Sequence, residues 1–102
     1  MNVPPYFVPH KAGSRALVLD DVDDYDAFPS IVALWADKLG IQIIERVDGP
    51  DGRAWKGKYH KSTLWFVYDD LLADLRLVPE GKSALRDIER FGDSLRANAP
   101  KG

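Results

Sequence analysis

The stretch Thr63-Leu64-Trp65-Phe66-Val67-Tyr68 decides how this chain folds, because it is apolar on both faces of a strand. Side chains alternate sides along a strand, so Leu64 points to one side and Trp65 to the other. A strand with one solvated face would carry polar residues on that side, and this strand does not. Both faces of the sheet therefore need a cover, from this chain or from a partner.

The segments around this strand predict further strands and two helices. Apolar residues at helical spacing predict helices over residues 27–39, ended by Gly40, and from residue 82 or 83 to 97. Alternating patterns between turn residues predict strands at 14–19, 41–47, 53–59, 63–68 and 72–78. We expect residues 1–13 to form an extended Pro-rich arm, 14–97 a single α+β domain, and 98–102 a frayed tail.

The element order β-α-β-β-β-β-α predicts an α+β fold, a two-layer sandwich. Successive short strands favour hairpins, so we expect a mostly antiparallel sheet of four to five strands with both helices on one face. The helix between the first two strands allows one parallel pairing. Leu64, Phe66 and Tyr68 would face the helices. Gly92 lies beside the apolar stripe of the last helix, where close approach to the sheet would explain a glycine.

The sheet face away from the helices is predicted to have an apolar centre and a charged rim. A patch of this kind is larger than most monomers expose, and it has the anatomy of an interface. The arm could cover it through Tyr6, Phe7 and Val8, or a second copy could pair with it, or another protein or an apolar ligand could bind. The candidate interface residues are Trp65, Val67, Ile44, Val18, Tyr6 and Phe7, with Val78 beside them.

An acidic cluster follows the first predicted strand and consists of Asp20, Asp21, Asp23, Asp24 and Asp26. Carboxylates bind calcium or magnesium, which makes Asp21, Asp23 and Asp24 candidate metal ligands. The glycine and distal glutamate of an EF-hand loop are missing, however, and helix capping explains the same composition. A third interpretation is an acidic patch that binds a basic partner, as in small acidic nuclease inhibitors and immunity proteins.

Basic and aromatic residues alternate in the predicted strand at 53–59. Lys56 and Lys58 fall on one side, and Trp55 and Tyr59 on the other, which is typical of a half-buried strand. The net charge is −2 and the isoelectric point is near 5.6, whereas a nucleic-acid-binding domain is usually strongly basic. We therefore expect no nucleic-acid partner.

Catalytic signatures are not visible in the sequence. The chain has no cysteine, which excludes disulfides, thiolate zinc sites and thiol nucleophiles. Its histidines are His10 and His60, and a His–carboxylate pair would need one of them near Asp69, Asp70 or the acidic cluster. No serine has a nucleophile-elbow context, and no glycine-rich loop would hold a phosphate. We expect no catalysis and no cofactor.

These observations predict a small protein-binding or assembly module of 102 residues, with itself (as a homodimer) or another protein as partner. The second hypothesis is an acidic inhibitor or immunity-type protein acting through residues 20–26, and the third is a metal-dependent or hydrolytic enzyme. Prolines interrupt the first apolar residues, and no apolar run approaches the roughly 18 residues that span a bilayer. We therefore expect a cytoplasmic protein with no membrane partner.

Overall fold

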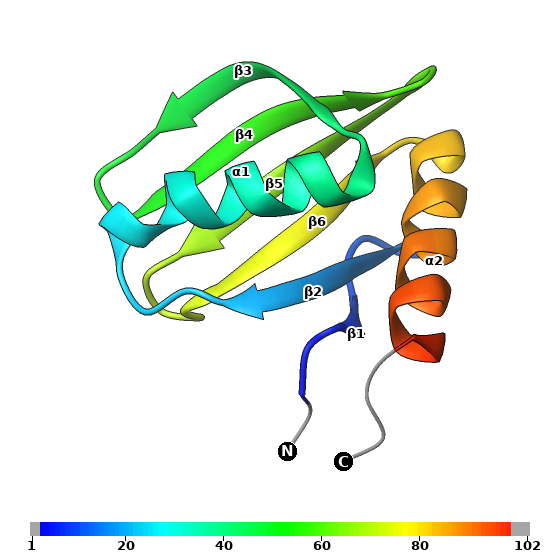
Figure 1. Ribbon diagram of the computed structural model, residues 1–102, viewed down its shortest axis with the longest axis horizontal. Coiled ribbons are helices and arrows are strands. Elements are labelled where there is room, and N and C mark those ends of the chain that lie inside the picture. The colour runs from blue at the N-terminus through cyan, green and yellow to red at the C-terminus, as the bar shows by residue number, and fades with distance from the viewer. Residues whose placement is uncertain (1–2, 99–102) are drawn as a thin grey trace.

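The computed structural model describes residues 3–98, which form a six-stranded sheet, two α-helices and one 3-10 turn (Figure 1). The strands are β1 (Tyr6–Pro9), β2 (Arg15–Asp21), β3 (Gln42–Asp48), β4 (Gly52–Tyr59), β5 (Ser62–Asp69) and β6 (Asp74–Glu80). The helices are α1 (Phe28–Leu39) and α2 (Lys82–Ala97), and the 3-10 turn η1 (Tyr25–Ala27) leads into α1. The predicted α+β fold is confirmed.

The sheet order is β1-β2-β6-β5-β4-β3, and every neighbouring pair is antiparallel. The parallel pairing that the sequence allowed across α1 does not form, because β6, β5 and β4 lie between β2 and β3. The arm is also more ordered than expected. Its residues 6–9 pair with β2, since Tyr6, Phe7 and Val8 favour a strand and Pro9 occupies the last strand position, where proline is tolerated.

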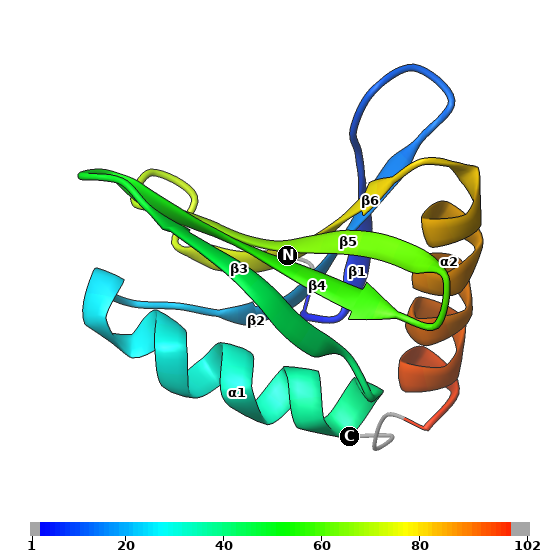
Figure 2. The ribbon, with the colours of Figure 1, turned by 90° about the horizontal axis from the view of Figure 1, so that it is seen from above.

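Helices α1 and α2 pack on the same face of the sheet, as predicted. Figure 2 shows α1 running beneath the sheet and α2 at one end of it. The ring of Phe28 in α1 lies 5.2 Å from the ring of Trp55 in β4, edge to face. In α2, Ala84 and Ile88 are fully buried. The core between the layers includes Leu64 and Phe66, each fully buried, as expected for the helix-facing side of β5.

Local signals explain where the helices begin and end. The Asp24 carboxylate accepts hydrogen bonds from the backbone N–H groups of Asp26 and Ala27, at 2.7 and 2.9 Å, and so caps η1. Gly40 ends α1 in the left-handed conformation at φ 72°. Gly92 faces Phe7 of β1, and a Cβ built on it would lie 2.3 Å from Cζ of that ring. Close approach to the sheet is thus the reason for this glycine.

Strand β6 begins at Asp74, two residues later than predicted. The carbonyl of Asp69 accepts hydrogen bonds from the N–H groups of Leu72 and Ala73, so these residues belong to the preceding turn. Leu75 and Leu77 of β6 are fully buried. The predicted tail at 98–102 lies outside the described residues except for Asn98. Within residues 3–98, no helix has the length and hydropathy required to cross a membrane.

Candidate functional site: the open face of the sheet

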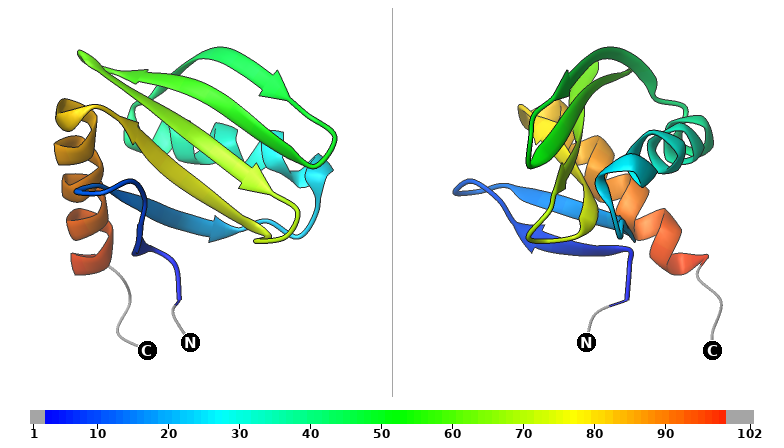
Figure 3. Two further views of the ribbon diagram at one scale, coloured as in Figure 1. Left: turned by 180° about the vertical axis from the view of Figure 1, so that it is seen from behind. Right: turned by 90° about the vertical axis from the view of Figure 1, so that its left-hand side faces the viewer.

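We call the sheet face opposite α1 and α2 the open face; Figure 3 (left) shows it in front of α1. Cross-strand partners share a face, so the register identifies its members. Trp65 lies opposite Val78 on β6 and Lys56 on β4. Val67 lies opposite Arg76 and Ala54, also on β6 and β4. All six of these side chains are partly exposed, which leaves apolar surface accessible at the centre of the sheet.

Strand β1 widens the open face at its edge and does not fold across it. Tyr6 lies opposite Val18, and Val8 lies opposite Ala16, on the same side as Val78. Phe7 points the other way, toward Gly92 of α2, because side chains alternate along the strand. Phe7 therefore lies on the helix side of the sheet and not on the predicted face with Trp65. The arm therefore does not cover the open face. A second copy of the chain and another protein or ligand are the remaining predicted covers.

Two other predicted interface residues differ in what they expose. Val18 lies on the predicted face but is fully buried, with Tyr6 and Arg76 as its cross-strand neighbours, so it offers no contact surface. Ile44 occupies a β-bulge and is 49% exposed. The bulge also reverses the faces of the residues after it, which places Val47 opposite Ala54 on the open face, instead of on the helix side where simple alternation from Ile43 would put it.

A hollow of about 520 Å³ lies on the open face, between the β1–β2 loop and the start of α2. Trp65 and Val78 line it, with Leu85 of α2 beside them. Figure 2 shows the β1–β2 loop projecting beside the junction of β6 and α2. The remaining lining residues are His10, Lys11, Ala12, Gly13, Ser14, Pro79, Glu80, Gly81 and Lys82. The hollow therefore has an apolar floor and a rim with more basic than acidic groups.

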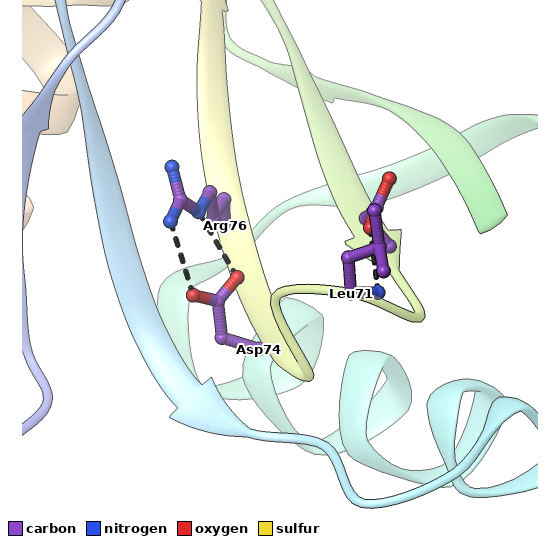
Figure 4. Close-up of polar contacts among 4 residues, drawn as sticks. Leu71, Asp74 and Arg76 are labelled. Atoms are coloured by element: carbon purple, nitrogen blue, oxygen red, sulfur yellow. Dashed lines mark hydrogen bonds and ion pairs between the residues drawn. The ribbon is translucent and has the colours of Figure 1, made fainter.

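A bidentate ion pair lies on the open face near the other end of β6. Nε and Nη2 of Arg76 donate to Oδ1 and Oδ2 of Asp74, at 3.0 and 3.2 Å (Figure 4). Asp74 is 7% exposed and lies opposite Asp69 and Asp21 in the neighbouring strands. Arg76 thus offsets part of the repulsion among three aspartates, and its planar fork suits a carboxylate.

Ten aspartates gather at this end of the sheet, which we call the acidic end. Strands β2, β3 and β5 finish there and β4 and β6 begin there, so their terminal residues come together. The N–H of Asp70 donates to the carbonyl of Asp51 at 3.0 Å. Within residues 3–98 the set is Asp20, Asp21, Asp23, Asp24, Asp26, Asp48, Asp51, Asp69, Asp70 and Asp74. The sequence identified the first five as a cluster because they are neighbours along the chain. It missed the other five because only strand pairing brings them close to the first five.

Several carboxylates of the acidic end have structural partners. Asp24 caps η1, and Oδ2 of Asp20 accepts a hydrogen bond from Nε1 of Trp35 at 3.1 Å. The candidate metal ligands Asp21, Asp23 and Asp24 are not part of a possible metal site: within residues 3–98, no three carboxylate or histidine side chains are placed so that they could hold an ion. Helix capping accounts for Asp24 instead.

Carboxylates of the acidic end help to raise the pKa values of two residues on the helix side of the sheet, Tyr68 and Arg53. The hydroxyl of Tyr68 donates to Oδ1 of Asp70 at 2.5 Å; this bond, together with burial and nearby carboxylates, raises the pKa of Tyr68 to about 12. The guanidinium of Arg53 lies 4.1 Å from the ring centre of Tyr25. The neighbouring Tyr25 side chain, followed by attraction to Asp48, raises the pKa of Arg53 above its ordinary value, although burial opposes the shift. The contact between Arg53 and Tyr25 holds η1 against the sheet.

The histidines lie at the end of the sheet opposite to the acidic end. His10 is in the β1–β2 loop and His60 in the β4–β5 turn, where its ring packs against Tyr59 at 4.4 Å between ring centres. Neither loop meets Asp69, Asp70 or the acidic cluster, so the His–carboxylate pairing considered from sequence does not form. Ser62, which is 3% exposed, hydrogen-bonds to Ser83 and to Asp87 of α2. This network connects β5 to α2.

Comparison with known proteins does not assign the chain to a family. No protein-family model, no curated protein and no solved structure matches the chain. The function must therefore be argued from the geometry of the open face and of the acidic end.

Proposed function

We propose that this protein is a protein-binding and assembly module without catalysis, and that it acts through the open face. The observation that carries the proposal is the partial exposure of Trp65, Val67 and Val78 at the centre of a sheet face that α1 and α2 leave uncovered. Tryptophan at the centre and arginine nearby are the residues that contribute most at protein interfaces. Arg76 and Lys56 flank this centre.

The edges of the sheet support binding through the face. An unprotected edge strand would invite pairing with another strand, but both edges carry features that oppose it. Edge strand β3 contains a bulge and the charged residues Glu45, Arg46 and Asp48. Edge strand β1 has four residues and ends in Pro9. The face is thus the better surface for association, and a second copy of the chain is the first partner to test.

Substitution of Trp65 tests this proposal. We expect the mass of the wild-type protein in sedimentation velocity to rise with concentration, and Trp65→Asp to suppress that rise. The variant should keep the wild-type far-UV circular dichroism, because its side chain is not part of the core between the layers. Leu34→Asp is the matched control, since Leu34 is 72% exposed on α1, away from the open face. Equal association of wild type and Trp65→Asp would contradict the proposal.

A second function is favoured by the acidic end. Ten aspartates within residues 3–98, with Arg53 and Arg76 among them, produce a concentrated negative potential. Such a surface would attract a basic partner and speed its association, which is the logic of an acidic inhibitor or immunity-type protein. Asp21, Asp23 and Asp51 are exposed there and make none of the capping contacts described for Asp24.

Neutralisation of the exposed aspartates tests the second function. An oligolysine peptide serves as a basic probe, and its affinity is measured by calorimetry at low and high salt. Asp21→Asn, Asp23→Asn and Asp51→Asn combined should weaken binding at low salt, and 0.5 M salt should remove most of the difference, because about a 4 Å Debye length screens exposed charges. Unchanged affinity in the triple variant would exclude the acidic end as the binding surface.

A further inference from the structure

The turn between β5 and β6 carries exposed leucines and carboxylates, which match the apolar floor and the basic rim of the hollow. The turn between β5 and β6 exposes Leu71 by 93% and Leu72 by 52%. This turn, which we call the acidic turn, consists of residues 69–72. A single exposed leucine is ordinary on a protein surface. Two adjacent leucines on a turn that also carries Asp69 and Asp70 form an apolar tip with negative charge behind it.

The acidic turn is held by hydrogen bonds to the side chain and the carbonyl of Asp69. Oδ1 of Asp69 accepts from the N–H of Leu71 at 2.7 Å, and the Asp69 carbonyl accepts from Leu72 and Ala73 at 3.2 and 2.9 Å. Figure 4 shows Leu71 on this turn, beside the ion pair of Asp74 and Arg76. A rigid tip loses little conformational entropy on binding, which favours docking into a hollow.

The hollow complements this tip in polarity and in charge. Its floor is formed by Trp65, Val78 and Leu85, which could receive an apolar side chain. Lys11 and Lys82 lie on its rim, where they would face the carboxylates behind the tip. Its volume of about 520 Å³ lies in the range of ligand pockets, so a leucine side chain fits within it.

The tip and the hollow cannot meet within one molecule. The acidic turn precedes β6 and the hollow lies at its far end, and a strand of seven residues spans roughly 23 Å. Figure 1 shows the β5–β6 turn and the start of α2 at opposite ends of β6. Contact between the two surfaces therefore requires two copies of the chain.

We propose that the acidic turn of one copy docks into the hollow of the next, with Leu71 against Trp65 and the turn carboxylates facing Lys11 and Lys82. The proposal rests on the proposed function, because it specifies which partner the open face binds. The contact joins two different surfaces, so each docked copy leaves one tip and one hollow available. Association of this kind continues head to tail into a ring or a filament, unlike a two-fold dimer.

Two variants that each lack one surface test the proposal by sedimentation velocity of the full chain. Leu71→Asp removes the tip, and its 93% exposure means that the fold should tolerate the change. Lys11→Glu with Lys82→Glu removes the basic rim and leaves the tip intact. We expect each variant to self-associate at least about tenfold more weakly than wild type at low salt, the effect of one hot-spot side chain. Leu34→Asp should associate like wild type.

Mixing the two variants gives the sharpest result. Leu71→Asp keeps its hollow and Lys11→Glu/Lys82→Glu keeps its tip, so an equimolar mixture should form a 1:1 dimer that does not grow further. A wild-type protein that stays monomeric, with a Kd weaker than about 1 mM, overturns the proposal. If Leu71→Asp associates like wild type while Trp65→Asp does not, head-to-tail docking fails and the proposed function survives. If Trp65→Asp also associates like wild type, the proposed function fails too.

Discussion

The two sides of β5 carry similar side chains in different surroundings. Leu64 and Phe66 are fully buried beneath the helices, whereas Trp65 and Val67, which alternate with them, keep part of their surface exposed. Both sides are apolar, and the difference lies in what covers each side. The contribution of an apolar side chain to stability therefore depends on its position relative to α1 and α2, and the uncovered side retains surface for binding.

The largest expected effect on stability comes from truncating one side chain on each side of β5. Phe66→Ala should lower the free energy of unfolding by about 3–5 kcal/mol, because it opens a cavity between the layers. Trp65→Ala should cost less than about 2 kcal/mol, although it removes more atoms, because part of that side chain already contacts solvent. Urea unfolding followed by circular dichroism measures both values. Equal costs would show that the open face is part of the core.

A second test concerns the packing of β1 against α2, on the side of the sheet that the helices cover. Gly92→Ala would place a Cβ 2.3 Å from Cζ of Phe7, so the ring must move. Overpacking of this kind costs about 1–3 kcal/mol, whereas the gain in helix propensity is about 1 kcal/mol. We expect a net loss of about 1 kcal/mol in urea unfolding.

The matched background for Gly92→Ala is Phe7→Ala, which removes the clashing ring. There the same substitution should become stabilising by about 1 kcal/mol, because helix propensity alone remains. A sign that does not reverse between the two backgrounds would show that Phe7 does not determine the need for glycine at position 92.

The covered side was the more predictable of the two from sequence. Alternation in β5 predicted that Leu64 and Phe66 face the helices, since side-chain periodicity follows from backbone geometry, and both are fully buried. The strand at residues 6–9 was missed because its flanking prolines favoured an irregular arm. Simple alternation assigns the residues after Ile44 to the wrong faces, because a bulge inserts one residue without a clear signal in the sequence.

The open face and the acidic end depend on tertiary structure and were predicted only in part. Trp65 and Val67 were identified, but the hollow beside them arises from the placement of the β1–β2 loop next to α2, which local patterns do not encode. Asp51 and Asp70 are distant in sequence from Asp21, and the antiparallel register alone brings their strand ends together. Sites built from several strand ends require the topology before they can be recognised.

A further effect appears only at alkaline pH, and it tests whether the helix-facing side of β5 is coupled to the acidic end. Tyr68 lies on the helix side of β5, and its hydrogen bond to Asp70 raises its pKa to about 12, above the value near 10 of an unfolded chain. The folded state thus holds the phenolic proton more tightly. That stabilisation is complete below pH 10 and is lost as pH rises toward 12.

Between pH 10 and 12 the free energy of unfolding of the wild type should therefore fall more steeply than that of Tyr68→Phe, whereas below pH 9 the difference between them should stay constant. Asp70→Asn keeps a hydrogen-bond acceptor but removes the charge, so its slope should lie between those two. Urea unfolding at each pH measures the slopes. Parallel curves for wild type and Tyr68→Phe would mean that Tyr68 titrates as it does in the unfolded chain, and that the acidic end does not influence the covered side of β5.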